Sequence, residues 1–444
     1  MVILRMEINI TSRETIKPSV PTSAECKTLK LCLFDVFQLN TYFPLILFYS
    51  KTNNLKEFSD VSTQLKKSLS EALTIFYPLA GRRCDYFSID CNDAGAIFME
   101  ASVNTTMKVF LKPPNLELLN QLLPCEANKC HPHEEVLPQL LVQVNKFQCG
   151  GIAIGLCNLH ILLDAYSCSV FLKTWFAICK GSKEEISWPD FSSAASSFPP
   201  RNTTGVRAGM LNINKDSNIE ENCTTRRFLF DDKAINELKS MSTCDETKPT
   251  RYEVVSSFIS KHMIVAMKED KTRPMVALHV VNMRKRMGEP FSRGAVGNLL
   301  WPALVVLEGV NKNTEIIDLV EILKEGLGKL TKDLFLKLQN DPGFLWSDEC
   351  AELMLEGIAA NKPISLVFTS WGNMGFNEVD FGCGKPLWLA QRGGTKESIP
   401  NTVILMETRE GIEAWITMPE KHISILEHDV DFLLFALLNP SILI

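Results

Sequence analysis

"LLVQVNKFQCGGIAIGLCNLHILLDAYSCSVFLKTWFAICKG", residues 140–181, contains two apolar runs followed by a longer segment with a different spacing. The two runs are rich in Val and Ile, and the Gly-Gly pair between them is typical of a β-hairpin. After His160, apolar residues recur at helical spacing without Pro or Gly until Gly181, a common residue at a helix C-cap. We therefore predict a hairpin, a strand-to-helix junction at His160, and a helix that ends at Gly181.

Other segments show the same mixture of strands and helices. Residues 61–82 begin with Leu and Phe at helical spacing until Pro78 stops the pattern, and residues 251–267 repeat this spacing. Residues 275–287 predict a strand that ends in a basic cluster. Because no regular strand–helix repeat is visible, the sequence predicts a mixed α/β (α+β) fold.

The length of the chain predicts two domains of similar size. A chain of 444 residues exceeds the roughly 250 to 300 residues at which single hydrophobic cores stop growing. Residues 181–225 are rich in Ser, Pro, Asn and Gly and lack periodicity, as in a linker or a functional crossover. We expect an N-terminal domain at 1–180, a crossover loop at 181–225 and a C-terminal domain at 226–444.

Charge and cysteine usage limit the partners and the compartment. The net charge is -6, and no long run of Lys or Arg occurs, so we do not expect a nucleic-acid partner. Charges at Arg5 and Glu7 interrupt the first apolar residues, and no run of about 18 apolar residues follows, so we expect no secretory signal and no membrane partner. The 14 cysteines lie mostly in apolar contexts, typical of reduced thiols, which favours a cytoplasmic protein.

One segment, "CEANKCHPH" at 125–133, could in principle hold zinc. Its Cys spacing is unusual for a zinc site, and the segment follows Pro124 as an exposed loop would. We therefore expect no metal at its four potential ligands, Cys125, Cys130, His131 and His133.

His160 and Asp164 form an H-x-x-x-D pattern at the predicted junction. There the imidazole can point out of the end of the sheet, while the carboxylate begins the helix, where the helix dipole favours it. The residues alone leave two interpretations open: a histidine packed in the core, or a general base, which contributes roughly 10² to 10⁴ in rate. We find no G-x-S-x-G, H-E-x-x-H or P-loop motif that would indicate another chemistry.

A second cluster lies far downstream, in "TSWGNMGFNEVDFGCGKP" at 369–386. Its "DFGCGKP" part predicts a tight polar turn. By itself, such a turn could be only the end of a hairpin.

Together, five segments resemble the plant BAHD acyltransferases, which transfer an acyl group from a coenzyme A thioester to an alcohol or an amine. The resemblance covers nearly the whole chain. Its segments, in order, are "FYPLAGR" at 76–82, "QVNKFQCGGIAIGLCNLHILLDA" at 143–165, "VNMRKRM" at 281–287, "DFGCGKP" at 380–386 and "GIEAWITM" at 411–418.

The resemblance implies two chloramphenicol-acetyltransferase-like domains with mixed β-sheets, joined by a long crossover loop and enclosing a solvent channel. His160 would stand in the middle of the channel as general base, with acyl-CoA and the acceptor entering from opposite ends. Asp164 would be structural and orient the motif. Its implied salt-bridge partner is Arg284, with Arg286 as the reserve.

The resemblance also implies roles for residues in the downstream cluster. Thr369 matches a possible oxyanion donor, and Trp371 and Leu163 match the channel wall. The coenzyme A side of the channel would be shaped by a loop of five residues, Asp380, Phe381, Gly382, Cys383 and Gly384. Two positions depart from the family pattern. Cys383 replaces a tryptophan, which puts in doubt any contact made by an indole there, and Ala165 replaces a frequent glycine.

The amino-acid sequences of these motifs are most similar to those of the alkaloid O-acetyltransferase branch. We expect a monomeric enzyme that transfers acetyl from acetyl-CoA, as co-substrate, to a hydroxyl of a plant alkaloid, with no permanently bound cofactor. Alternatives are a terpenoid or volatile alcohol, or an amine, with another acyl-CoA. A catalytically inactive binding paralogue is disfavoured because His160 is present. A peptide-condensing domain would carry a second histidine where this chain has Leu159.

Overall fold

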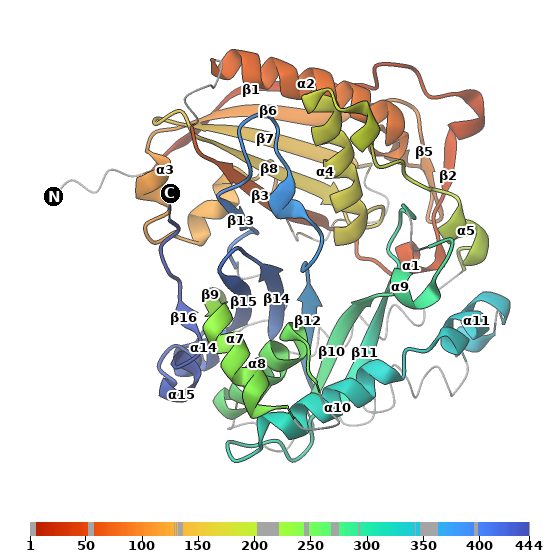
Figure 1. Ribbon diagram of the computed structural model, residues 1–444. Coiled ribbons are helices and arrows are strands. Elements are labelled where there is room, and N and C mark those ends of the chain that lie inside the picture. The colour runs from red at the N-terminus through yellow and green to blue at the C-terminus, as the bar shows by residue number, and fades with distance from the viewer. Residues whose placement is uncertain are drawn as a thin grey trace.

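The computed structural model describes residues 6–51, 57–127, 129, 131, 136–201, 222–243, 248–267, 275–291, 294–341, 343–346, 363–394 and 398–443. Two large mixed β-sheets lie one above the other, each with helices packed against it (Figure 1). The predicted mixed α/β fold with two sheet-rich domains is confirmed.

The upper sheet is built mainly from the first 160 residues. Strands β6 and β7 pair in parallel and all other neighbours are antiparallel. The order of its strands is β1 (Ile8–Ile16), β6 (Ala96–Val103), β7 (Leu140–Phe147), β8 (Ile152–Leu159), β3 (Tyr42–Tyr49) and β13 (Trp388–Ala390). The last strand comes from the C-terminal half, so the second half contributes one strand to the sheet of the first.

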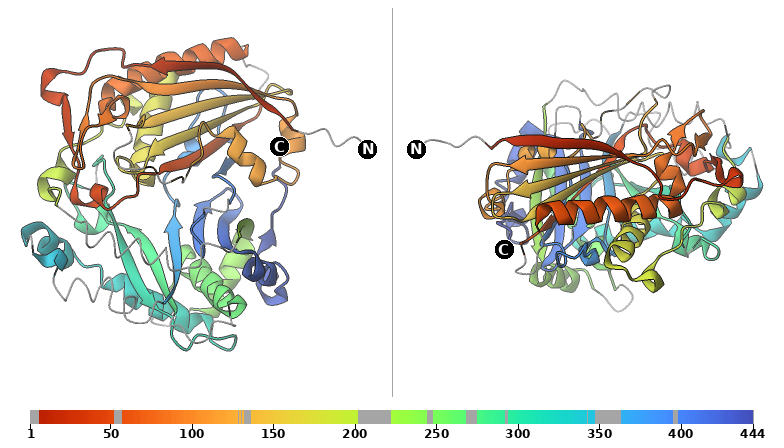
Figure 2. Two further views of the ribbon diagram at one scale, coloured as in Figure 1. Left: turned by 180° about the vertical axis from the view of Figure 1, so that it is seen from behind. Right: turned by 90° about the horizontal axis from the view of Figure 1, so that it is seen from above.

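The predicted hairpin, junction and helix are confirmed. β7 and β8 pair from Leu140 opposite Asn158 to Lys146 opposite Ile152. Helix α4 (Ala165–Lys180) then ends at Gly181, whose φ of 82° is the left-handed conformation that glycine adopts easily. Helix α2 (Phe58–Ile75) begins three residues before the predicted segment and packs against α4 on one face of the sheet (Figure 2).

The lower sheet belongs to the second half of the chain. The order of its strands is β11 (Leu300–Val306), β10 (Met275–Asn282), β12 (Ile364–Ser370), β14 (Thr402–Glu407), β15 (Gly411–Pro419), β9 (Cys223–Asp231) and β16 (Leu437–Leu438). A separate apolar core lies between this sheet and four helices, α7 (Asp232–Met241), α8 (Arg251–Ala266), α10 (Ile316–Gly328) and α14 (Glu420–Leu426).

Shorter elements complete the fold. A small sheet has the order β2 (Thr28–Lys30), β5 (Ser88–Asp90) and β4 (Arg82–Arg83). Among the described residues, the other α-helices are α1 (Leu33–Val36), α3 (Met107–Phe110), α5 (Ser193–Ser197), α9 (Arg284–Met287), α11 (Lys332–Asn340) and α15 (Val430–Leu433). 3-10 turns span Ala24–Cys26, Tyr77–Ala80, Glu117–Leu122, Lys183–Glu185, Phe344–Trp346 and Phe376–Glu378.

The connection between the halves is described in part. Residues 202–221 of the predicted crossover lie outside the described residues. The part before them bonds to the second half, since the backbone N–H of Asp190 donates to the carbonyl of Gly294 at 2.8 Å. The domain boundaries at 180 and 225 stay a prediction. Within the described ranges, no helix is long and apolar enough to cross a bilayer.

Candidate active site

His160 lies directly after strand β8, where the two halves of the molecule meet. Its backbone N–H donates to the carbonyl of Thr41 at 2.9 Å, which continues the pairing of β8 with β3. The following turn is closed by Asn158, whose side chain donates to the carbonyl of Leu163 at 3.2 Å. The imidazole is half-buried. The turn therefore fixes the backbone of His160 and leaves part of its side chain open to solvent.

Asp164 caps helix α4 and forms a buried ion pair. Its Oδ1 accepts from the backbone N–H of Ser167 at 2.8 Å. Nη1 and Nη2 of Arg284 donate to its two oxygens at 2.7 and 3.3 Å, and both side chains are at most 2% exposed. Arg286 lies elsewhere and donates to the carbonyls of Leu327 and Leu330. The ion-pair partner of Asp164 is thus Arg284.

Arg284 also holds a loop of the second half against helix α4. Its guanidinium donates to the carbonyls of Ala295 at 3.0 Å and Gly297 at 2.8 Å, and to the hydroxyl of Ser167 at 3.0 Å. It lies over the ring of Tyr166, with 4.3 Å between Cζ and the ring centroid. The pair therefore joins the two halves beside His160 without contacting its ring.

The imidazole bonds to Asn298, which follows this loop. Nδ1 of His160 lies 2.9 Å from Oδ1 of Asn298, and Nδ2 of Asn298 donates to the His160 carbonyl at 2.7 Å. Nδ2 and the backbone N–H of Asn298 also donate to Oδ1 of Asp35, at 2.9 and 2.7 Å. Among the residues that the structure describes, none bonds to Nε2 of His160.

Asp35 is a buried carboxylate on helix α1, which lies beside α9 at the junction of the halves (Figure 1). Burial raises the pKa of its carboxyl above the usual value, although N–H donors from Cys32 and Asn298 oppose that rise. Burial also raises the pKa of the Cys32 thiol, so that this cysteine is a neutral thiol at neutral pH.

Aromatic rings line one side of His160. Phe43 contacts the imidazole edge to face, with 5.9 Å between centroids, and contacts Trp371 at 4.6 Å. Thr369 lies two residues before Trp371, at the end of strand β12, and is half-buried. Leu163 is fully buried. The structure thus brings Trp371 near His160 through Phe43.

The "DFGCG" segment forms the predicted turn. Oδ1 of Asp380 accepts from the backbone N–H groups of Gly382 and Gly384, both at 2.8 Å. Phe381 packs on Trp175 of helix α4, with 4.7 Å between ring centroids. Cys383 is buried, and burial raises the pKa of its thiol to about 12. The turn is therefore attached to the N-terminal sheet and its helix.

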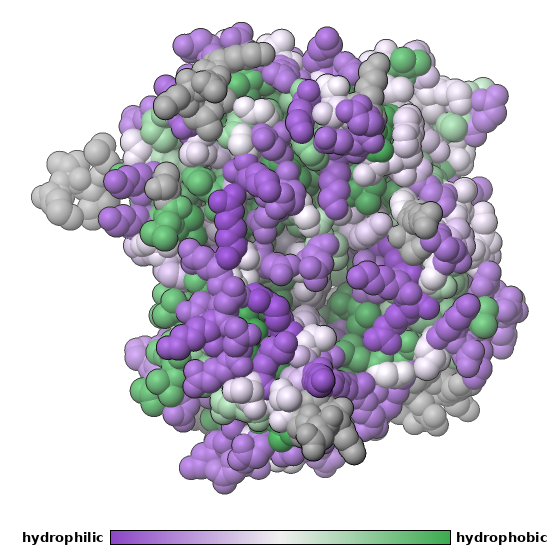
Figure 3. Space-filling model, viewed as in Figure 1, coloured by the Kyte–Doolittle hydropathy of each residue, from purple (hydrophilic) through white to green (hydrophobic). Residues whose placement is uncertain are grey.

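The molecular surface is hollowed where the two halves meet (Figure 3). A groove of about 520 Å³ also lies along the crossover segment and shares lining residues with a small cavity beside Asp35. His160 is not among the residues that line either one. The groove is lined by Thr28, Leu29, Lys30, Tyr77, Pro189, Asp190, Phe191, Ser192, Ala195 and Ser196.

The Cys and His segment at 125–133 is described only in part, because Cys130 and His133 lie outside the described residues. The ring of His131 packs on Tyr42, with 6.0 Å between centroids. Within the described part of the chain, no three His, Cys, Asp or Glu side chains gather closely enough to hold a metal ion.

Sequence reasoning missed Asp35 and Asn298. A signal for each was present, since Asp35 is an acid inside the apolar stretch "LCLFDVF", and Asn298 is a polar residue between Gly297 and "LLW". A buried polar side chain needs hydrogen-bond partners, and either residue could have been suspected on that ground. Nothing in the linear sequence shows that they bond to each other or to His160.

The sequence and the fold match known acyltransferases. The model of the Transferase family matches residues 6–433. Akuammiline synthase 2 of Alstonia scholaris is 36% identical, over 98% of both chains. Limonoid 21-O-acetyltransferase of Melia azedarach is 35% identical over 99% of this chain and 100% of its own. Stemmadenine O-acetyltransferase of Catharanthus roseus is 35% identical over 95% of this chain and 97% of its own.

Two solved structures share the fold. Vinorine synthase superimposes with a TM-score of 0.80 at 31% identity, over 97% of this chain and 98% of its own. TRI101 of F. sporotrichioides, complexed with coenzyme A and T-2, has a TM-score of 0.74 at 18% identity, over 93% and 99%. The second similarity concerns the fold alone.

Proposed function

The chain belongs to the Transferase family, the BAHD acyl-CoA-dependent acyltransferases, and from that premise we propose that it acetylates a hydroxyl group of a polycyclic plant alkaloid. One observation carries the proposal. His160 lies half-buried at the junction of the two halves, with Nδ1 bonded to Asn298 and with Asp164 engaged by Arg284. Only Nε2 is left to meet a substrate.

In the proposed reaction, His160 acts as general base. Nε2 takes the proton of the acceptor hydroxyl while the oxygen attacks the carbonyl carbon of acetyl-CoA. The tetrahedral oxyanion collapses, the carbon–sulfur bond breaks, and the imidazolium returns the proton to the coenzyme A thiolate. The products are the acetyl ester and free coenzyme A. Both substrates are bound together, and no group becomes attached to the enzyme.

Asp164 has a structural role in this proposal. Its carboxylate faces Arg284 and the first turn of helix α4, and so it orients the turn that carries His160 without touching the imidazole. The channel between the halves would admit acetyl-CoA and the acceptor from opposite ends. The hollow at their junction in Figure 3 is consistent with this arrangement.

Thr369 would donate a hydrogen bond to the oxyanion. Its position at the end of β12, close in sequence to Trp371 at the aromatic wall, supports this role. Thr369→Val removes the hydroxyl at similar volume, whereas Thr369→Ser keeps it. We expect a loss in kcat of about 10² for the valine variant and less than tenfold for the serine variant. Equal activity of the two variants would remove Thr369 from the mechanism.

The "DFGCG" turn would shape the coenzyme A side of the channel, and Trp371 and Leu163 would form its wall. The turn closes on itself through Asp380, which accepts from the backbone N–H groups on both sides of residue 383 and uses no atom of that residue's side chain. This supports a structural role that tolerates Cys383 in place of the family tryptophan.

The choice of acyl group and acceptor is supported by the relatives. Those compared above include enzymes named as O-acetyltransferases of stemmadenine and of limonoids. The limonoid enzyme and the stemmadenine enzyme are both 35% identical to this chain. A terpenoid alcohol is therefore retained as the second acceptor candidate. We further propose a cytoplasmic monomer, which size-exclusion chromatography with light scattering would test.

The test incubates the purified protein with acetyl-CoA and a panel of alkaloid and terpenoid alcohols, and follows the release of free coenzyme A thiol. We expect turnover with an alkaloid alcohol and a loss of about 10² or more in kcat for His160→Gln. Turnover by the glutamine variant at the wild-type rate would contradict the role of His160. Turnover with terpenoid alcohols alone would replace the first acceptor class by the second.

A further inference from the structure

We propose that Asp35 is a positioning residue that, through Asn298, holds His160 in the tautomer with a proton on Nδ1 and a free lone pair on Nε2. The inference rests on the proposed role of His160 as general base. It concerns a buried carboxylate that bonds to Asn298 and to the backbone of Cys32. The contacts of Asn298 carry the argument.

The orientation of the Asn298 amide follows from its neighbours. One end of the amide lies 2.9 Å from Oδ1 of Asp35 and 2.7 Å from the carbonyl oxygen of His160. A carboxylate and a carbonyl only accept hydrogen bonds, so this end must be the NH2 group, and each of its two hydrogens has an acceptor. The other end of the amide is therefore the oxygen.

The tautomer of His160 follows in turn. The amide oxygen of Asn298 faces Nδ1 of His160 at 2.9 Å. Because an amide oxygen cannot donate, Nδ1 must carry the proton of the neutral imidazole. Nε2 is then unprotonated, which is the state that a general base requires before it takes the proton of the acceptor.

Asp35 and the His160 carbonyl together decide this orientation. Its Oδ1 accepts from both the side chain and the backbone N–H of Asn298, and its Oδ2 accepts from the backbone N–H of Cys32 at 2.8 Å. If the amide were reversed, its oxygen would face both the Asp35 carboxylate and the His160 carbonyl. Two such contacts between acceptors are unfavourable, so the carboxylate adds its own preference to that of the carbonyl and the amide keeps one orientation.

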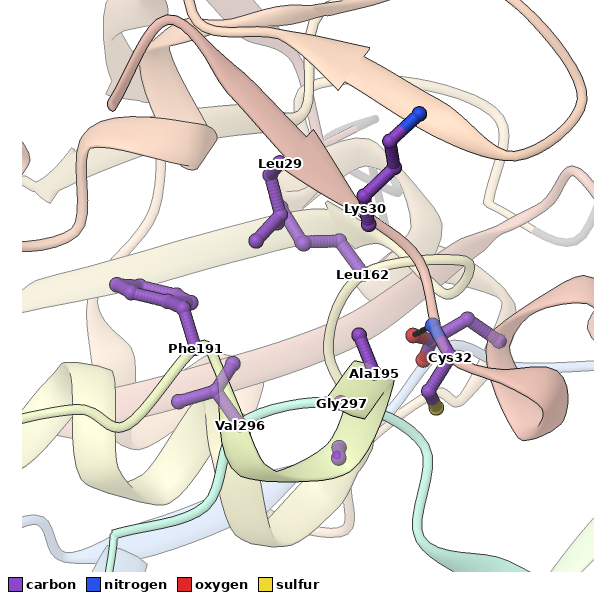
Figure 4. Close-up of a pocket in the computed structure, with 10 residues that line it drawn as sticks. Leu29, Lys30, Cys32, Leu162, Phe191, Ala195, Val296 and Gly297 are labelled. Atoms are coloured by element: carbon purple, nitrogen blue, oxygen red, sulfur yellow. Dashed lines mark hydrogen bonds between the residues drawn. The ribbon is translucent and has the colours of Figure 1, made fainter. Parts of the chain in front are cut away.

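The surroundings keep Asp35 and the Asn298 loop close together. Asp35, Cys32 and Gly297 border a cavity of about 10 Å³, which has room for about one water molecule. Figure 4 shows that Leu29 and Leu162 lie on the same cavity, so its walls are largely apolar. Gly297 has a φ of 133°, and a Cβ atom there would lie 3.4 Å from Oδ1 of Asp35. Side chains rarely adopt this φ, so glycine at position 297 lets the loop follow its course beside the carboxylate.

A capping role alone would be the competing explanation. Asp35 is the third residue of helix α1, and its carboxylate closes a capping box with Cys32. Glu253 has the same role in helix α8, where its carboxylate accepts from the backbone N–H of Thr250 at 2.8 Å. Glu253→Gln is therefore the matched control for Asp35→Asn, since only Asp35 is connected to His160.

The experiment combines kinetics with histidine ¹⁵N NMR on the full-length protein. The spectrum of His160→Gln identifies the His160 signal among the 7 histidines. We expect the wild-type His160 to show a protonated Nδ1 and an unprotonated Nε2. We expect Asp35→Asn to lose about 10² in kcat, less than the ~10⁴ that a wrong tautomer costs a catalytic histidine in a serine protease. Its KM for acetyl-CoA stays within threefold, and its His160 signal moves towards the other tautomer.

Asn298→Ala and the double variant test the route of the effect. If Asp35 acts through Asn298, Asn298→Ala loses a similar factor, and the double variant is no worse than either single variant within about threefold. Multiplied losses would mean that Asp35 acts by another route. Glu253→Gln keeps the kcat and the His160 signal of the wild type.

Three results would overturn the inference. They are a wild-type His160 protonated at Nε2, an Asp35→Asn variant with kcat within threefold of the wild type, and multiplied losses in the double variant. The first needs only the His160→Gln spectrum that assigns the signal, and it decides the matter even if Asp35→Asn does not fold. An active His160→Gln would instead contradict the proposed function, whereas an inactive one beside an active Asp35→Asn would refute only the role of Asp35.

Discussion

Replacing Asp164 with asparagine should destabilise the protein through the charge that it leaves behind. In the folded protein Asp164 is fully buried, and Arg284 is 2% exposed. Asparagine has nearly the same shape, and its oxygen can still accept from the backbone N–H of Ser167. The cap of helix α4, a contribution of about 1 kcal/mol, is therefore retained. What changes is that the buried guanidinium of Arg284 loses the negative charge that neutralises it.

The expected magnitude follows from the contacts that remain. Breaking a buried ion pair by removing one partner costs roughly 3–5 kcal/mol. Arg284 keeps four neutral acceptors, the carbonyls of Ala295 and Gly297, the hydroxyl of Ser167 and the amide oxygen of Asn282. It also keeps the ring of Tyr166, a cation–π contact of about 0.5–2 kcal/mol. We therefore expect the low end, a loss of about 3 kcal/mol in the free energy of unfolding.

The assay is urea denaturation followed by tryptophan fluorescence, because Trp175 on helix α4 is buried. Asp231→Asn is the matched control. Asp231 caps helix α7 by accepting from the backbone N–H of Ala234 at 2.7 Å, without a buried arginine beside it. We expect the control to stay within about 0.5 kcal/mol of the wild type. A loss below about 1 kcal/mol for Asp164→Asn, equal to that of the control, would refute the reasoning.

Three further substitutions test the packing and the electrostatics of the fold. Gly155→Ala should lower the free energy of unfolding by about 1–3 kcal/mol, since its Cβ would lie 2.1 Å from the carbonyl oxygen of Leu122; an unchanged urea midpoint would contradict this. Burial lowers the pKa of His279 to about 3, so unfolded His279 binds a proton below about pH 6.5 while the folded form stays neutral until about pH 3. The free energy of unfolding should thus fall by about 1.4 kcal/mol per pH unit on acidification below pH 6.5. Urea titrations at pH 7 and pH 5 measure this fall, which should be about 2 kcal/mol smaller in His279→Gln than in the wild type. Tyr49→Phe removes a buried hydrogen bond of 2.9 Å to the carbonyl of Val379 and should cost about 1 kcal/mol, again from the urea midpoint; a fully stable variant would show that this bond does not hold the "DFGCG" turn.

Local patterns were sufficient for the elements around His160. The hairpin, the junction and helix α4 depend on two apolar runs rich in Val and Ile, on the Gly-Gly pair between them and on helical spacing, which all act within a few residues. The pairing of strands far apart in the sequence could not be predicted in this way. Strand β13, residues 388–390, pairs with β3 in the N-terminal sheet. This pairing could not be predicted, because the two strands are more than 300 residues apart and no pattern in the sequence specifies it.

The order of motifs along the chain was enough to indicate the acyltransferase family and to single out His160. It also placed Asp164 at the start of a helix, because a carboxylate near a helix N-terminus is a local effect. What surrounds the imidazole was decided only by the tertiary structure. Asp35 and Asn298 are 263 residues apart, and Asn298 and His160 are 138 apart. Hydrogen bonds of about 3 Å between such residues exist only after two sheets and a loop held by Arg284 have packed together, so they depend on the whole fold and on no segment of it.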